Sequence, residues 1–178
     1  MKIIIGLGNP GKEYEITRHN TGWLFIDYLR KKYNVEKKKE KFESEIFEIK
    51  IKGEKVMLVK PLTYMNLSGR SVEKIKKFYK VLDEDVLIVY DDIDIAFGEV
   101  RYRTTGSGGT HNGMKNIIQV LKNSEISRIR IGIGKPTFEN QDLAEFVLDR
   151  FTKLEIEHIN EVFKLAEEKM NIFLDKHN

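Results

Sequence analysis

Residues 2–11, KIIIGLGNPG, decide the fold of this chain. A short apolar run from Ile3 to Ile5 is typical of a buried β-strand, and the glycine-rich segment behind it is typical of a sharp turn. In α/β proteins, functional groups gather beyond the carboxyl ends of the strands. The opening stretch therefore predicts an α/β fold with a site that begins near Asn9.

The same glycines fit the pattern G-x-G-x-x-G, which is typical of dinucleotide-binding proteins. In such proteins a helix begins inside the glycine run, so that its N-terminus meets the pyrophosphate. Here residues 12–20, KEYEITRHN, separate the glycines from the first helical pattern, and they bring two glutamates to the place of the phosphates. The sequence argues against a nicotinamide cofactor, and we expect the turn to present Tyr14 and His19 instead.

The composition is that of an ordinary folded domain. The chain has 178 residues, 40% hydrophobic and 33% charged, with a net charge of +3. This length suits one domain, and we expect residues 1–178 to form it. No apolar run reaches the roughly 18 residues of a membrane span. Cysteine is absent, which excludes disulfides and thiolate metal sites. We expect a cytoplasmic protein that does not enter a membrane.

Strand and helix patterns alternate along the whole chain. Strands are predicted at residues 2–7, 45–51, 55–60, 86–90, 99–103 and 129–133, and helices at residues 21–29, 72–79, 114–121 and from about 152 onward. Residues 52–54 are expected to form a hairpin turn. This order predicts a single α/β domain with a twisted mixed β-sheet flanked by helices.

His19 is the first candidate for chemistry. It lies in the segment TRHN at the expected start of a helix, where the helix dipole disfavours the charged imidazolium. A neutral imidazole accepts a proton near neutral pH. Asp91 and Asp92 follow the apolar strand VLIV, and one of them is expected to orient His19. A capping role for His19, and a turn or metal-ligand role for the aspartates, remain open alternatives.

Three asparagines follow predicted strands at the corners that lead into helices: Asn9, Asn66 in KPLTYMNLSG, and Asn112 in GSGGTHNG. A carboxamide donates to a developing oxyanion and accepts from a substrate amide. The pattern G-x-S-x-G of a nucleophilic serine is absent, and no clear metal cage is visible. The sequence therefore predicts attack of water on an acyl carbon, with His19 as the base.

Two pairs of arginines are spaced i, i+2, which places the members of each pair on one face of a strand. The pairs are Arg101 with Arg103 and Arg128 with Arg130. They are expected to bind phosphates, with ordinary surface ion pairs as the alternative. The basic run at residues 30–39 is expected to be a solvated helix end and loop, with contact to RNA left open as the alternative.

Taken together, these segments resemble the bacterial-type peptidyl-tRNA hydrolases. The resemblance extends from Ile3 to Phe151 and rests on GLGNPGKEYEITRHNTGW, KPLTYMNLSG, DDIDIAFGEVRYR, GSGGTHNGMKNI and RIRIGIGKP, in that order. It implies hydrolysis of the ester between a peptide and the 3′-terminal ribose of tRNA, which recycles tRNA from prematurely released peptidyl-tRNA. The implied enzyme is a monomer that needs no metal or organic cofactor and contacts the acceptor stem and the 3′ end.

The resemblance also implies roles for single residues. His19 corresponds to the general base, Asp91 to its orienting partner and Asn9 to the contact with the transition state. The implied substrate-binding residues are Tyr14, Met65, Asn66, His111 and Asn112, and the implied tRNA-binding residues are Arg101, Arg103 and Arg130. His111 is also linked to contact with tRNA. Thr110 departs from the family pattern, which has glycine at its position.

One rival function uses the same scaffold. It is that of a non-catalytic RNA-binding protein, similar to the chloroplast splicing factors that resemble this hydrolase. The presence of His19, Asp91 and all three asparagines favours the enzyme.

Overall fold

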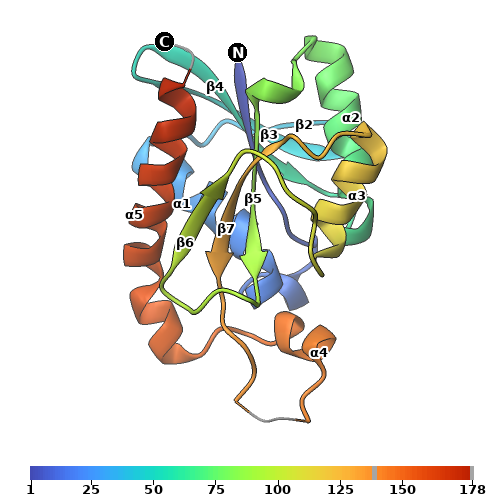
Figure 1. Ribbon diagram of the computed structural model, residues 1–178. Helices are drawn as coiled ribbons and strands as arrows, with labels where there is room; N and C mark the ends of the chain where they lie inside the picture. Colours follow the sequence, from blue (N-terminus) through green and yellow to red (C-terminus); the bar gives the residue numbers. More distant parts are fainter. Residues whose placement is uncertain (138–139, 177–178) are drawn as a thin grey trace.

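The computed structural model describes residues 1–137 and 140–176, which form a seven-stranded mixed sheet with helices on both faces (Figure 1). The strands are β1 (Lys2–Gly6), β2 (Lys39–Lys41), β3 (Ser44–Ile51), β4 (Glu54–Pro61), β5 (Val86–Asp92), β6 (Val100–Arg103) and β7 (Ser127–Gly132). The helices are α1 (Thr21–Lys32), α2 (Ser68–Tyr79), α3 (Asn112–Leu121), α4 (Leu143–Leu148) and α5 (Lys153–Asp175). The predicted fold class is confirmed.

Strand β1 lies at the centre of the sheet, whose order is β2-β3-β4-β1-β5-β7-β6. It pairs in parallel with β4 on one side and with β5 on the other. Ile3 and Ile5 pack into the core on one face of the sheet, and Ile4 packs into the core on the opposite face. A strand that is buried on both faces needs a continuous apolar run, which is why residues 2–6 do not alternate with polar residues.

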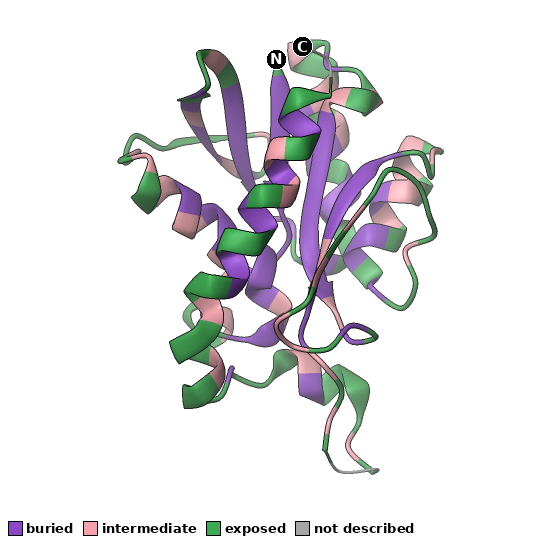
Figure 2. Ribbon diagram, turned by 60° about the vertical axis from the view of Figure 1, so that its left-hand side comes forward, coloured by how far each residue is buried: buried purple, intermediate pink, exposed green. Residues whose placement is uncertain are grey.

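Each face of the sheet is covered by a pair of helices. Phe25 of α1 and Phe163 of α5 belong to the core on the first face, whereas Val72 of α2 and Ile117 of α3 belong to the core on the second. Figure 2 shows strands that are largely buried and helices that are buried along one side and exposed along the other. The helical stripes seen in the sequence are these inward-facing sides.

Two short elements differ from the sequence-based expectation. Strand β2 has the sequence KEK and is fully exposed, so it carries no apolar signal. Helix α4 has only six residues, and a stretch of that length is too short for a clear helical period. The long helix α5 does begin where expected, because Thr152 and Glu155 form a reciprocal capping box at its N-terminus.

The parallel strands β4, β1, β5 and β7 all point toward one edge of the sheet. The segments that follow β1, β4 and β5, together with the N-terminus of α3, therefore meet at that edge. The site described below is built from these segments. None of the helices in the described part of the chain combines the length and apolar character that a bilayer span requires.

Candidate active site

The glycine turn after β1 brings the backbone close to the first turn of α1. A Cβ atom on Gly6 would lie 2.1 Å from the carbonyl oxygen of Gly22, and one on Gly8 would lie 2.5 Å from the ring of Trp23. These glycines therefore permit close packing between strand and helix. Helix α1 begins only at Thr21, after two short 3₁₀ turns, so its N-terminus does not open from the glycine run as a dinucleotide fold requires.

Asn9, in this turn, is held at three atoms. Asn20 accepts a hydrogen bond from the Asn9 backbone nitrogen at 2.8 Å and donates one to the Asn9 carbonyl oxygen at 3.0 Å. The backbone nitrogen of Met65 donates to Oδ1 of Asn9 at 2.7 Å. Because Oδ1 is already engaged, the Nδ2 group is the end of the side chain that remains for a substrate.

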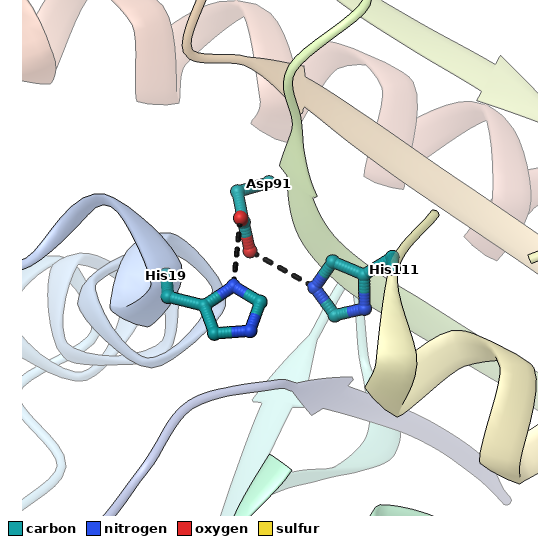
Figure 3. A group of neighbouring side chains, drawn as sticks. All are labelled: His19, Asp91 and His111. Atoms are coloured by element: carbon teal, nitrogen blue, oxygen red, sulfur yellow. Dashed lines mark hydrogen bonds and ion pairs between the residues drawn. The ribbon is translucent and has the colours of Figure 1, made fainter. Parts of the chain in front are cut away.

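His19, Asp91 and His111 form a hydrogen-bonded group (Figure 3). His19 lies in the 3₁₀ turn before α1, Asp91 lies near the end of β5, and His111 caps the N-terminus of α3. Nδ1 of His19 is 2.9 Å from Oδ2 of Asp91, and Nε2 of His111 is 3.0 Å from Oδ1 of the same carboxylate. Each carboxylate oxygen thus has one imidazole partner.

The backbone around α3 determines the tautomer of His111. The backbone nitrogen of Met114 donates a hydrogen bond to Nδ1 of His111 at 3.2 Å. Nδ1 therefore carries a lone pair, the ring proton resides on Nε2, and Nε2 donates to Asp91. For His19 the carboxylate sets the opposite arrangement, in which Nδ1 donates to Asp91 and Nε2 carries the lone pair.

Burial and charge shift the pKa values of the group in different directions. Burial raises the pKa of Asp91, but the two imidazoles outweigh it and hold that pKa well below its usual range. Burial lowers the pKa of His19, but the charge and hydrogen bond of Asp91 outweigh it, so the net shift is upward. Burial dominates for His111, whose pKa is lowered. Near neutral pH the group therefore contains an ionised carboxylate and a neutral His111.

The same three side chains lie close enough to be considered as metal ligands. A metal on Nε2 of His111 would need that nitrogen's proton to leave the ring or move to Nδ1. Nδ1 already accepts the N–H of Met114, so it has no lone pair free for a proton. The local hydrogen bonding therefore favours a proton-handling group over a metal site.

A cleft of about 650 Å³ opens in front of this group. The predicted catalytic and substrate-binding residues all line it: Asn9, Tyr14, His19, Met65, Asn66, Asp91, His111 and Asn112. Arg130 also reaches its wall, and α4 contributes the apolar side chains Leu143, Val147 and Leu148. The cleft thus combines a polar end with an apolar wall, and it is large enough for a small ligand or the end of a larger one.

The predicted arginines separate into different roles. Strands β6 and β7 are antiparallel, with Arg101 opposite Arg130 and Arg103 opposite Arg128, so all four lie on one face of the sheet. The expectation that Arg128 binds phosphate is not supported, because this side chain is buried and donates to the carbonyl oxygens of Ile126, Ser107 and Ser124. Arg128 instead anchors the glycine-rich loop before α3.

The other three arginines remain accessible. Arg130 is partly buried and lies 3.3 Å from a carboxylate oxygen of Asp92. Arg101 and Arg103 are exposed beside the cleft without lining it. These three residues, called the arginine strip below, lie on one face of β6 and β7, and Arg101 also forms an ion pair with Glu99 at 3.8 Å.

Four of the six basic side chains in the run at residues 30–39 form ion pairs with acidic neighbours. Its ion pairs are Arg30 with Asp27, Lys32 with Glu167, Lys38 with Glu45 and Lys39 with Glu48. These contacts are typical of a solvated helix end and loop.

Thr110 stands where the family pattern has glycine, and its backbone does not adopt the positive φ that would strain a threonine. Within the described glycine-rich loop, positive φ values occur at Gly106 and Gly109, and Thr110 is not among the positions that adopt them. Of the two remaining histidines, His158 lies exposed on α5, and His177 lies outside the described residues.

Sequence reasoning missed three residues that support the site. Asn20 clamps the backbone of Asn9, and Tyr64 precedes Met65 with φ 62° and ψ 159°, a conformation that is rare outside glycine. Arg18 donates to the carbonyl oxygen of Phe146 in α4 and to Glu155 in α5. Asn20 and Arg18 flank His19 directly in TRHN, and this adjacency is the signal by which they could have been considered.

Comparisons with known proteins agree on one family. The family model described as peptidyl-tRNA hydrolase matches residues 3–178. The peptidyl-tRNA hydrolase of Alkaliphilus oremlandii is 53% identical over 166 residues, covering 93% of this chain and 89% of that protein. The peptidyl-tRNA hydrolase of Clostridium novyi is 45% identical over 176 residues, covering 99% of this chain and 93% of that protein.

Solved structures give the same result. The crystal structure of peptidyl-tRNA hydrolase from Acinetobacter baumannii has a TM-score of 0.84 and 34% identity, and the match covers 97% of this chain and 94% of that chain. A 5′-methylthioadenosine/S-adenosylhomocysteine nucleosidase from Helicobacter pylori, with a TM-score of 0.55 and 7% identity, shares the fold alone. Function must therefore be argued from the site rather than from the fold.

Proposed function

The chain belongs to the peptidyl-tRNA hydrolase family, and from this premise we propose how its cleft hydrolyses the ester bond between peptide and tRNA in peptidyl-tRNA.

His19 is the general base. Its Nδ1 donates to Asp91 at 2.9 Å, so its Nε2 lone pair is free to take a proton from water. This single hydrogen bond carries the proposal, because it fixes both the orientation and the tautomer that base catalysis needs. After the proton transfer, the adjacent carboxylate stabilises the imidazolium. As water loses this proton, its oxygen bonds to the ester carbonyl carbon and the bond from that carbon to the 3′-terminal ribose oxygen then breaks. His19 returns its proton to the leaving ribose oxygen, which restores the neutral base.

Asn9 stabilises the negative charge that develops on the carbonyl oxygen. Its Oδ1 is held by the backbone nitrogen of Met65, which leaves Nδ2 as a fixed donor in the cleft. A donor that is positioned before the reaction contributes about 2.7 to 4 kcal/mol to transition-state stabilisation. Tyr14 and Met65 line the same cleft, where they contact the substrate around the ester.

Asn66 and Asn112 bind the amide groups of the peptide. Both line the cleft, and a carboxamide both accepts from an N–H and donates to a C=O. Aminoacyl-tRNA has a free ammonium group in place of the first amide, so it loses this geometry and is desolvated at a cost. The pair thereby favours peptidyl-tRNA over aminoacyl-tRNA.

The RNA part of the substrate lies along the arginine strip. Arg101, Arg103 and Arg130 contact phosphates of the acceptor stem and the 3′ end without reading bases. The enzyme acts as a cytoplasmic monomer, and its chemistry requires neither a metal nor an organic cofactor.

An ester-release assay tests this assignment. Purified protein is incubated with N-acetyl-aminoacyl-tRNA and release of the N-acetyl amino acid is measured over time. We expect turnover by the wild type and a loss of about 10²- to 10⁴-fold in His19→Ala. His158→Ala, which removes an exposed imidazole on α5, is the matched control and should retain full activity.

Two results would contradict the proposal. Near-normal turnover by His19→Ala would exclude this side chain as the base. Binding of tRNA by the wild type without any ester release would instead support the rival function of a non-catalytic RNA-binding protein.

A further inference from the structure

His111 is enclosed at the inner end of the cleft. Only 7% of its side chain is exposed, and its ring lies 4.9 Å from the ring of His19 and 4.7 Å from the ring of Tyr90, measured between centroids. The proposed reaction does not use it, and the family resemblance assigns it to substrate or tRNA contact. Its surroundings indicate a different role.

Both ring nitrogens of His111 are already occupied. Nδ1 accepts the N–H of Met114 at 3.2 Å, and Nε2 donates to Oδ1 of Asp91 at 3.0 Å. A neutral imidazole has one donor and one acceptor, so the ring has no further hydrogen-bonding group to offer a substrate.

We propose that His111 is a positioning residue for the reaction, which holds the Asp91 carboxylate in the orientation that directs the base His19. This inference rests on the proposed function, because it describes how the catalytic side chains of the same site are held in position. His111 acts through Asp91 and does not touch the substrate.

The geometry of the carboxylate supports this role. Asp91 is almost completely buried, and its two oxygens have separate imidazole partners, His19 on Oδ2 and His111 on Oδ1. Removing the partner of Oδ1 would leave a buried charged oxygen without a donor, which is unfavourable. The carboxylate would then turn to share His19 or to meet water, and the fixed direction of the His19 ring would be lost.

The hydrogen bond from Met114 to Nδ1 of His111 also determines which of the two histidines accepts the proton from water. Because the N–H of Met114 faces Nδ1, His111 cannot become charged without losing its helix-capping bond. The groups that face His111 are Asp91, His19, Tyr90 and, by its charge, Asp92. Among them, His19 is the imidazole whose second nitrogen remains available to accept the proton from water.

Two substitutions separate the functions of the two nitrogens. In His111→Asn the new Oδ1 can still accept the N–H of Met114, because asparagine is a good N-cap residue, but no donor reaches Asp91. In His111→Gln the longer side chain can bring its amide nitrogen to Asp91. We expect kcat to fall roughly 10- to 100-fold in His111→Asn with an unchanged KM for N-acetyl-aminoacyl-tRNA, and to recover in part in His111→Gln.

Two kinetic outcomes would overturn the inference. A raised KM with an unchanged kcat in His111→Asn would show that the ring binds substrate. Equal losses in the Asn and Gln variants would show that the donor to Asp91 is not what matters. His158→Asn serves as the control, because it makes the same replacement at an exposed histidine of α5, and urea unfolding of each variant reports whether the fold is retained.

A second measurement does not depend on turnover. In ¹⁵N NMR of histidine-labelled protein, His111 should remain neutral with its proton on Nε2 over the pH range in which the His19 signal titrates. Protonation of Nδ1 of His111 in that range would overturn the inference. If the wild type shows this behaviour but hydrolyses no ester, the proposed function fails while the hydrogen-bonding arrangement stands.

Discussion

Asn20 holds Asn9 by both ends of its backbone, through hydrogen bonds of 2.8 Å to the nitrogen and 3.0 Å from its own amide to the carbonyl oxygen. Asn20 is completely buried, and it immediately follows the proposed base His19 in the chain. The base and the proposed oxyanion donor are therefore tied together through one side chain. A change at Asn20 should move both groups at once.

Asn20→Asp tests this coupling with a side chain of the same shape. The carboxylate keeps an acceptor for the Asn9 nitrogen but places a second oxygen against the Asn9 carbonyl, where a donor is required. We expect a loss of about 1 to 3 kcal/mol in the free energy of unfolding and a reduced kcat. Urea unfolding and the ester-release assay measure the two effects. An active variant of normal stability would show that the clamp is dispensable.

Tyr64→Gly and Tyr64→Ala test backbone strain beside the site. Tyr64 adopts φ 62° and ψ 159°, a region that costs about 1 to 3 kcal/mol for residues other than glycine. Both variants remove the ring, but only glycine relieves the strain. We expect the glycine variant to be more stable than the alanine variant by about 1 kcal/mol in urea unfolding, the reverse of the usual ranking. An alanine variant of equal or greater stability would contradict the presence of strain.

Asp91→Asn tests the tautomer of His19. The Nε2–H of His111 requires an oxygen opposite it, so the new amide group would face Nδ1 of His19. His19 would then carry its proton on Nε2 and lose the lone pair that accepts a proton from water. In histidine–carboxylate pairs this change costs about 10⁴ in kcat. The ester-release assay should show this loss, while tRNA affinity, measured by filter binding, should stay within a few-fold of the wild type.

The pH dependence of the rate reports on His19 directly. Burial lowers its pKa, but Asp91 raises it by more, so the folded-state pKa lies above 6.5. Only the neutral form acts as a base, so kcat/KM should rise with pH through that pKa and level off above it. A rate that is independent of pH across this region would contradict the assignment.

The contribution of His19 to the free energy of unfolding should fall as the pH rises, whereas kcat/KM should increase. A raised pKa means that protonated His19 stabilises the folded state below pH 6.5, and this contribution is lost as the pH rises through the folded-state pKa. Comparison of urea unfolding for the wild type and His19→Ala across the same pH range isolates this contribution.

Arg101→Ala combined with Arg103→Ala tests the RNA surface. Each lost phosphate contact should reduce the slope of log affinity against log salt by about 0.7 to 0.9. The matched control is Lys38→Ala with Lys39→Ala, which removes the same charge from a region where both lysines are paired with glutamates. Filter binding of tRNA at several salt concentrations gives both slopes. Equal slopes in the two double variants would place the RNA surface elsewhere.

Much of the architecture follows from local sequence pattern. Burial repeats along the chain with the period of each helix or strand, so the apolar pattern of a segment predicts which side is buried. Such patterns predict the apolar strand β1, the hairpin at Lys52 and Gly53, and the stripes of the long helices. The exposed strand β2 and the six-residue helix α4 have no clear apolar pattern, so the sequence does not predict them.

The sequence by itself determined the fold class, the candidate base and the family, because these are written in contiguous segments. Only the tertiary structure decided how the charged groups are partnered. It buried Arg128 under a loop, paired part of the basic run with acidic residues, and gave each oxygen of Asp91 its own imidazole, from His19 and His111. The partners are separated by as many as 135 residues along the chain, as for Lys32 and Glu167, and no local pattern indicates which atoms will meet. The physical reason is that a buried hydrogen bond is selected by the packing of the whole sheet and its helices, which the spacing of residues along one segment does not specify.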